Sequence, residues 1–213
     1  MEKETLRIEG FSDAVFAIAV TLLVLDLHFP QENSIKSGND LMIFLSNQWP
    51  SFLAFILSFF SIFIMWVNHH KIFKQIYSRN SAIMFANGLI LFLVSAVSYP
   101  TALLARYFDG QASSVVVAIY TSIFVLINLA YNLLWFVATR NKKLLRPGIT
   151  NAAIKQIRNN YLYGLPIYII ALILSFWFPA VSLLIILGLW IFWALSSGKI
   201  EMTLDKDYSD SLK

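Results

Sequence analysis

The sequence contains no cysteine and few charged residues. Charged side chains make up 13% of its 213 residues, whereas hydrophobic side chains make up 58% and the mean hydropathy is +0.68. Without cysteine the chain cannot form disulfides, use a catalytic thiolate or bind a metal through sulfur. Because a soluble domain carries about a quarter charged residues, this composition predicts an integral membrane protein.

Charges are missing altogether from four stretches, each longer than the roughly 20 residues that cross a hydrocarbon core. These stretches are residues 41–70, 80–105, 111–139 and 159–198. The last would be about 60 Å long as a single helix, so it must fold back, and Phe178-Pro179 supplies the break. Together with a segment around 11–29, the stretches predict six transmembrane helices.

Helices are the economical structure because backbone groups in lipid must bond within their own segment, and the ten-residue alternation of barrel strands is absent. We therefore expect an all-α polytopic membrane protein. We also expect that it has no cleavable signal peptide. A single transmembrane domain should cover residues 1–200, and residues 201–213 should form a short cytoplasmic tail. The predicted helices cover about 5–29, 50–74, 79–105, 112–139, 157–177 and 180–198.

Basic residues are distributed unevenly between the connections. With both termini placed inside, 14 Lys and Arg residues fall on the inner side, and Lys36 and Arg106 fall outside. This excess predicts cytoplasmic termini and a location in the cell (inner or plasma) membrane. The basic connection over 139–158 is interpreted as a loop that meets anionic lipid headgroups rather than nucleic acid.

The first predicted helix carries two carboxylates at the ends of its apolar run. Only 12 residues separate Asp13 from Asp26, and about 18 Å of helix is short for a lipid-exposed span. Since a charge in hydrocarbon costs at least about 2.5 kcal/mol, both carboxylates should face protein or water. This helix is therefore expected to be central, either lining a pathway or filling an interior.

One face of this helix repeats at three- and four-residue spacing. It carries Ala14, Ile18, Thr21 with Leu22, and Leu25. Copies of the helix around a symmetry axis would stack rings of branched side chains that can gate by dewetting, and Asp26 would form a cation-attracting ring at the outer mouth. The alternative is an ordinary packed helix, and periodicity alone leaves both interpretations open.

Three motifs follow one another along the chain. Residues 7–13 fit R-x-x-x-F-S-D, residues 66–73 fit W-x-x-H-H-x-x-F, and residues 99–104 read Y-P-T-A-L-L. In this order the motifs resemble the potassium channels of the transmembrane-protein-175 family in its prokaryotic single-repeat form. The resemblance implies a potassium-selective cation channel rather than an enzyme, with six helices per subunit and a pore lined by the first helix of each subunit in a homotetramer.

The resemblance also implies partners and residue roles. K⁺ would be the permeant ion, with no cofactor, no small-molecule substrate and no nucleic acid, and the lipid bilayer would surround the tetramer. The pore constriction or gate would lie at Ile18, Leu22 and Leu25, and Thr21 would contribute to selectivity. The other motif residues are interpreted as an interlocking structural network, because a buried charge without a partner is destabilising. They are Arg7, Phe11, Ser12, Asp13, Trp66 and His69.

A proton- or cation-coupled secondary transporter is the alternative, with Asp13 or Asp26 as the ion-binding carboxylate. Transporters typically show inverted repeats and broken helices, whereas no repeat is found and residues 11–29 contain no Gly or Pro. A non-conducting scaffold would leave the short span between the carboxylates unexplained. Three intramembrane asparagines are expected to bond between helices: Asn87, Asn128 and Asn132.

Overall fold

The computed structural model describes residues 4–31 and 35–194, and its regular elements are helices. In chain order these are α1 (Leu6–Leu22), the 3-10 helix η1 (Leu23–Asp26), α2 (Gly38–Asn47), α3 (Trp49–Gln75), α4 (Ser81–Ser95), α5 (Ser98–Tyr107), α6 (Ser113–Arg140), the 3-10 helix η2 (Lys142–Leu144) and α7 (Asn151–Ser175). A further apolar helix covers Pro179–Ala194. The predicted tail, and the end of the last predicted helix, lie outside the described residues.

Five helical segments of the described chain are long and apolar enough to cross a membrane. They are Leu6–Asp26, Trp49–Gln75, Ser81–Tyr107, Ser113–Arg140 and Asn151–Ser175. The prediction of an all-α, multi-pass membrane protein is therefore confirmed.

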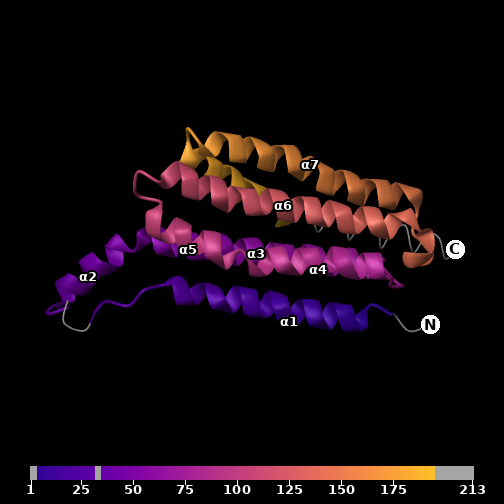
Figure 1. Cartoon of the computed structure of the whole chain (residues 1–213), viewed down its shortest axis with the longest axis horizontal. Helices are drawn as coiled ribbons and strands as arrows, with labels where there is room; N and C mark the ends of the chain where they lie inside the picture. The colour runs from indigo at the N-terminus through magenta and orange to yellow at the C-terminus, as the bar shows by residue number, and fades with distance from the viewer. Residues whose placement is uncertain (1–3, 32–34, 195–213) are drawn as a thin grey trace.

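The long helices run side by side (Figure 1). Helix α1 packs on α3 and α4, α5 packs between α3 and α6, and α7 packs on α6. In Figure 1, α1 therefore lies along one side of the bundle and α7 along the other. Helix α2 projects from one end and buries none of its residues.

Helix α1 is shorter than the predicted helix over 5–29. Its α-helical part ends at Leu22, η1 continues to Asp26, and Leu27 is extended with ψ of 115°. Pro30 explains why the helix does not reach residue 29, because the residue before a proline is disfavoured in the helical region. The prediction missed this end because it read the apolar pattern and not the proline that follows it.

The helix predicted over 79–105 is divided in the structure. Helix α4 ends at Ser95 and α5 begins at Ser98. Pro100 has no N–H and its ring would clash with the carbonyl of Ala96, four residues earlier. Around the break the backbone instead forms i→i−3 bonds, from Val97 N–H to the Val94 carbonyl and from Tyr99 N–H to the Ala96 carbonyl.

Helix α7 begins at Asn151, six residues before the predicted start at 157. Thr150 caps it, since its hydroxyl accepts a hydrogen bond from the Ala153 N–H. The basic connection is consequently shorter than predicted, and Lys155 and Arg158 lie on the first two turns of a helix.

Helix α2 is held at its start by a capping box. The Ser37 hydroxyl accepts from the Asp40 N–H, and the Asp40 carboxylate accepts from the N–H groups of Lys36 and Ser37. The backbone N–H of Lys36, followed by the Ser37 hydroxyl, lowers the pKa of Asp40. The cap therefore favours a charged carboxylate.

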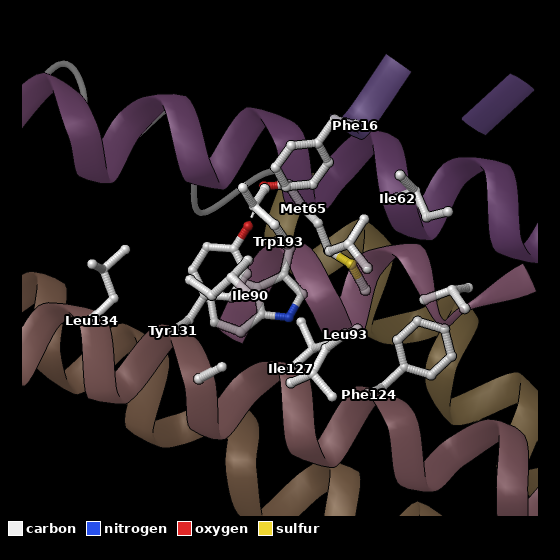
Figure 2. Packing of buried hydrophobic residues seen from close by; sticks show 14 of the residues in the cluster. Phe16, Ile62, Met65, Ile90, Leu93, Phe124, Ile127, Tyr131, Leu134 and Trp193 are labelled. Carbon is white, nitrogen blue, oxygen red and sulfur yellow. Dashed lines mark hydrogen bonds between the residues drawn. The ribbon is translucent and has the colours of Figure 1, made fainter. Parts of the chain in front are cut away.

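Large side chains from several helices meet in one core (Figure 2). Phe16 comes from α1, Met65 from α3, Phe124 and Tyr131 from α6, and Trp193 from the last helix. Because lipid tails are as apolar as these side chains, close packing and interhelical hydrogen bonds rather than exclusion of water hold such a bundle together.

Hydrogen bonds cross between helices at several depths. Ser58 on α3 bonds Thr101 on α5 at 2.6 Å and Tyr120 on α6 at 3.1 Å. The side chains of Asn128 and Asn132 both donate to the Tyr161 carbonyl, five residues before Pro166 on α7. The predicted interhelical role of these asparagines is confirmed.

One end of the bundle is tied together by backbone hydrogen bonds. Tyr77, just after α3, accepts from the Glu4 N–H and donates to the Leu144 carbonyl, while the Arg146 N–H donates to the Gln75 carbonyl. The start of α1, the end of α3 and the connection from α6 to α7 therefore lie at the same end. Most of the described basic residues belong to these segments.

Candidate functional site

Helix α1 has one buried face and one exposed face. Phe16, Ala19 and Leu23 are no more than 5% exposed, because they pack against α3 and α4. On the opposite face Ile18 is 58% exposed and Leu25 is 74% exposed. The described part of the chain therefore leaves much of this second face exposed.

The predicted constriction residues all lie on the exposed face. Leu22 is 47% exposed and lies one turn beyond Ile18. Thr21 is also exposed, and its hydroxyl lies 3.0 Å from both the Ala17 and the Ile18 carbonyl oxygens. The hydroxyl proton is thus directed to the helix backbone, which leaves oxygen lone pairs on a face without a partner in the chain.

Asp26 ends η1 and is half-buried, beside the extended residues that lead out of the helix. The 3-10 turn rotates it away from a regular continuation of α1. It therefore does not continue the 18–22 row as an α-helical position would, and Leu25 is the more exposed of the two residues.

A small cavity adjoins the exposed face where α4 gives way to α5. Its volume is about 250 Å³, and α1 contributes Val15, Ile18, Ala19 and Leu22 to its lining. The other walls are Ser95 and Ser98. Two of the predicted constriction residues thus have free space on one side, at the position where Pro100 interrupts the neighbouring helix.

The motif residues at the other end of α1 form two sets of contacts. The Trp66 indole N–H donates to the Asp13 carboxylate at 2.8 Å, which joins α3 to α1. The Asn87 amide donates to the Ser12 hydroxyl at 3.0 Å, and its oxygen lies 2.7 Å from His69 Nε2. This second set joins α1, α3 and α4.

Two residues assigned to this network lie outside it. Arg7 is exposed and makes no ion pair with Asp13, and Phe11 is 65% exposed. Arg7 does not reach Asp13, because six residues at about 100° each leave the two side chains about 120° apart around the helix.

Asn87 links this network, although the sequence motifs do not include it. Its side chain is buried and bonds both Ser12 and His69. An asparagine within a long uncharged stretch was the available signal, because a polar group in a membrane helix needs a partner. The sequence could not show which helices would supply that partner.

Residues 7–97 match the model of the family described as endosomal/lysosomal potassium channel TMEM175. A potassium channel of Chamaesiphon minutus is 41% identical over 197 residues, which cover 92% of this chain and 97% of that protein. A potassium channel of Streptomyces collinus is 41% identical over 162 residues, covering 76% of this chain and 77% of that protein. The chain belongs to the TMEM175 family.

A solved structure agrees with this assignment. The crystal structure of a lysosomal potassium-selective channel TMEM175 homolog from Chamaesiphon minutus superposes with a TM-score of 0.81 at 40% identity, covering 91% of this chain and 97% of that chain. The resemblance read from the three motifs is thus confirmed. TMEM175 is a family of channels and not of enzymes.

Proposed function

We propose that the chain is a potassium-selective channel that conducts passively through a homotetramer. The first helix of each subunit lines the pore, Ile18, Leu22 and Leu25 form the hydrophobic constriction, and Thr21 contributes to selectivity. The observation that carries the proposal is the exposed face of α1, which holds these four residues while the opposite face is buried.

Lipid could also cover an exposed apolar face, and three features favour an axis between subunits. The face carries a hydroxyl with outward lone pairs. The apolar run of α1 and η1 is flanked by two carboxylates, Asp13 and Asp26, whose separation is shorter than a lipid-exposed span. Two relatives that are 41% identical to the chain are named potassium channels.

The proposed topology has six membrane spans, and Pro179–Ala194 is part of the sixth. At about 24 Å for its 16 residues, this helix covers most of a hydrocarbon core of about 30 Å. The end that carries most Lys and Arg residues faces the cytoplasm, as the charge distribution indicates. Both termini are then cytoplasmic, in the cell membrane, and residues 201–213 follow the channel domain as a tail.

The alternative function, a secondary transporter, is not favoured by the family match. The break at Pro100 is a broken helix of the kind that transporters use, but it lies in the span Ser81–Tyr107 and not in α1. The break faces the exposed side of α1 through two serines. Uncoupled current therefore distinguishes the two functions better than any feature of the fold.

Single-cysteine variants test the pore directly, because the chain has no native cysteine. Leu25→Cys and Ile18→Cys should lose most of their K⁺ flux in proteoliposomes when treated with a cationic methanethiosulfonate. Ile173→Cys is the matched control, since Ile173 is 52% exposed on α7, far from α1. Unchanged flux in both α1 variants would reject α1 as the pore lining.

A further inference from the structure

A groove is lined by residues of α6 and α7. In Figure 1, α7 lies on the side of the bundle away from α1. The volume of the groove is about 830 Å³. Its lining combines apolar walls with polar groups near the ends of the helices. Seven of its eight lining residues are Asn132, Leu133, Phe136, Thr139, Arg140, Arg158 and Leu162. None of these residues belongs to the proposed pore.

The positive charge of the groove is not neutralised by a carboxylate on α6, on α7 or on the connection between them. Arg140 and Arg158 are both exposed, and neither makes an ion pair with another described residue. The sequence contains no Asp or Glu from residue 110 to residue 200. Two guanidinium groups therefore face the same groove without a carboxylate on either helix.

The apolar part of the groove continues deeper along the same helices. Phe136 is 62% exposed, and Leu133 and Leu162 are 42% and 46% exposed. Phe136 lies one turn from Arg140, and Leu162 lies one turn from Arg158 on the side toward the bundle centre. Because each turn advances about 5.4 Å, cationic groups at headgroup depth stand directly above apolar walls at acyl-chain depth.

We propose that this groove binds one anionic phospholipid, with the phosphate between Arg140 and Arg158 and an acyl chain along Phe136, Leu133 and Leu162. Guanidinium groups bind phosphate oxygens in paired hydrogen bonds, and basic pockets between membrane helices bind anionic headgroups. The proposal relies on the proposed function only for orientation, which places the groove in the cytoplasmic leaflet.

Native mass spectrometry of the purified full chain, titrated with phosphatidylglycerol in a neutral detergent, tests the site. Removing one charge near a lipid surface corresponds to about fivefold in affinity, so Arg140→Gln with Arg158→Gln should weaken the first bound lipid about 25-fold. The control is Lys143→Gln with Lys155→Gln, which removes two positive charges from the same end of the bundle at residues that do not line the groove. This double variant should change the lipid affinity less than fivefold. Equal losses in both double variants would overturn the site.

Other occupants give different results in the same titration. Phosphatidylcholine with the same acyl chains should bind at least tenfold more weakly, and millimolar inorganic phosphate should not displace phosphatidylglycerol. If phosphate displaces it, the groove is a soluble-anion site. The tail carries Glu201, Asp205, Asp207 and Asp210. If neutralising these four residues tightens lipid binding tenfold, the tail and not a lipid occupies the groove.

The binding measurement does not depend on conduction. A chain that binds phosphatidylglycerol through these arginines but passes no K⁺ would reject the proposed function and keep the lipid site. A chain that conducts K⁺, but whose lipid affinity is unchanged when both arginines are replaced, would keep the proposed function and reject the lipid site.

Discussion

The Asp13 carboxylate is exposed in the single chain and accepts a hydrogen bond from the Trp66 indole. This bond joins α1 to α3 next to the set formed by Ser12, Asn87 and His69. Its position, one to two turns before the exposed face around Ile18, suits a contact that fixes where α1 sits. A group that fixes the helix should matter to assembly more than to ion choice.

We predict that Asp13→Asn lowers the yield of assembled protein, with ion preference of the remainder unchanged. A hydrogen bond to a charged group contributes about 1.5–3 kcal/mol, whereas the neutral bond that the amide oxygen can still accept contributes about 0.5–1.5 kcal/mol. Trp66→Phe, which removes the donor, should act in the same direction. The measurement is the monodisperse fraction after purification, with Asp109→Asn in the exposed α5–α6 connection as the control. Normal yield with an altered ion preference would assign Asp13 to ion binding instead.

Thr21 presents the one hydroxyl on the exposed face between Ile18 and Leu25. We predict that Thr21→Ala lowers the K⁺/Na⁺ permeability ratio about fivefold, equivalent to about 1 kcal/mol for one lost oxygen contact. Thr21→Ser keeps the oxygen and should keep the ratio. Reversal potentials of the two variants make the comparison, and an unchanged ratio in Thr21→Ala would remove this residue from the selective part of the path.

The roles of single residues were predictable where they follow from chemistry alone. Asn128 and Asn132 needed partners in the membrane and have them. The partner of Asp13 could not be chosen from the sequence, because the predicted network contained both Trp66 and His69. The structure selects Trp66 and leaves Arg7 apart, which depends on how α1 is rotated against α3.

Helix α1 leaves uncovered a face that carries the branched side chains of Ile18 and Leu22. Ile18→Ala should raise the basal conductance at least about twofold, because a hydrophobic constriction that widens is more easily wetted. Ile170→Ala, at a site 52% exposed on α7, should leave it unchanged. Single-channel recording in planar bilayers measures the conductance of both variants. Equal currents in the unmodified protein, Ile18→Ala and Ile170→Ala would place the narrow part of the path elsewhere.

Helix α7 approaches the last helix closely at Gly164. A β-carbon there would lie 2.6 Å from Trp193 Cζ2 and 3.0 Å from Asn128 Nδ2. Gly164→Ala should therefore destabilise the bundle by roughly 1–3 kcal/mol. Gly188→Ala, where a β-carbon meets nothing within 4 Å, is the control. Thermal loss of the monodisperse peak should occur at a lower temperature in Gly164→Ala alone.

The helical type of the long apolar segments followed from the spacing of charges, whereas the ends of the helices did not. Pro30 and Pro100 each change a boundary through steric effects on residues before them. Thr150 extends α7 toward its start through a cap. Hydropathy averages over such single residues, so it locates an apolar run better than the residue at which a helix begins or breaks.

At the scale of the whole molecule, the single chain presents two surfaces for which different partners are proposed. In the proposed tetramer, the exposed face of α1 meets the same face of the other copies. The groove of α6 and α7 carries unneutralised arginines above apolar walls, which an anionic lipid complements. The family could be recognised from three short motifs, but the arrangement of copies could not be derived from them, because symmetry contacts leave no distinct pattern in one sequence.

The bi-ionic reversal potential of the purified protein in a planar bilayer tests the proposed function most directly. With equal K⁺ on one side and Na⁺ on the other, the current should reverse with the Na⁺ side positive, by about 59 mV for each tenfold of K⁺ over Na⁺ permeability. A pH gradient should leave this potential nearly unchanged, and current should rise with voltage without saturating. Reversal at zero, or a saturating current whose reversal follows the proton gradient, would contradict a potassium channel.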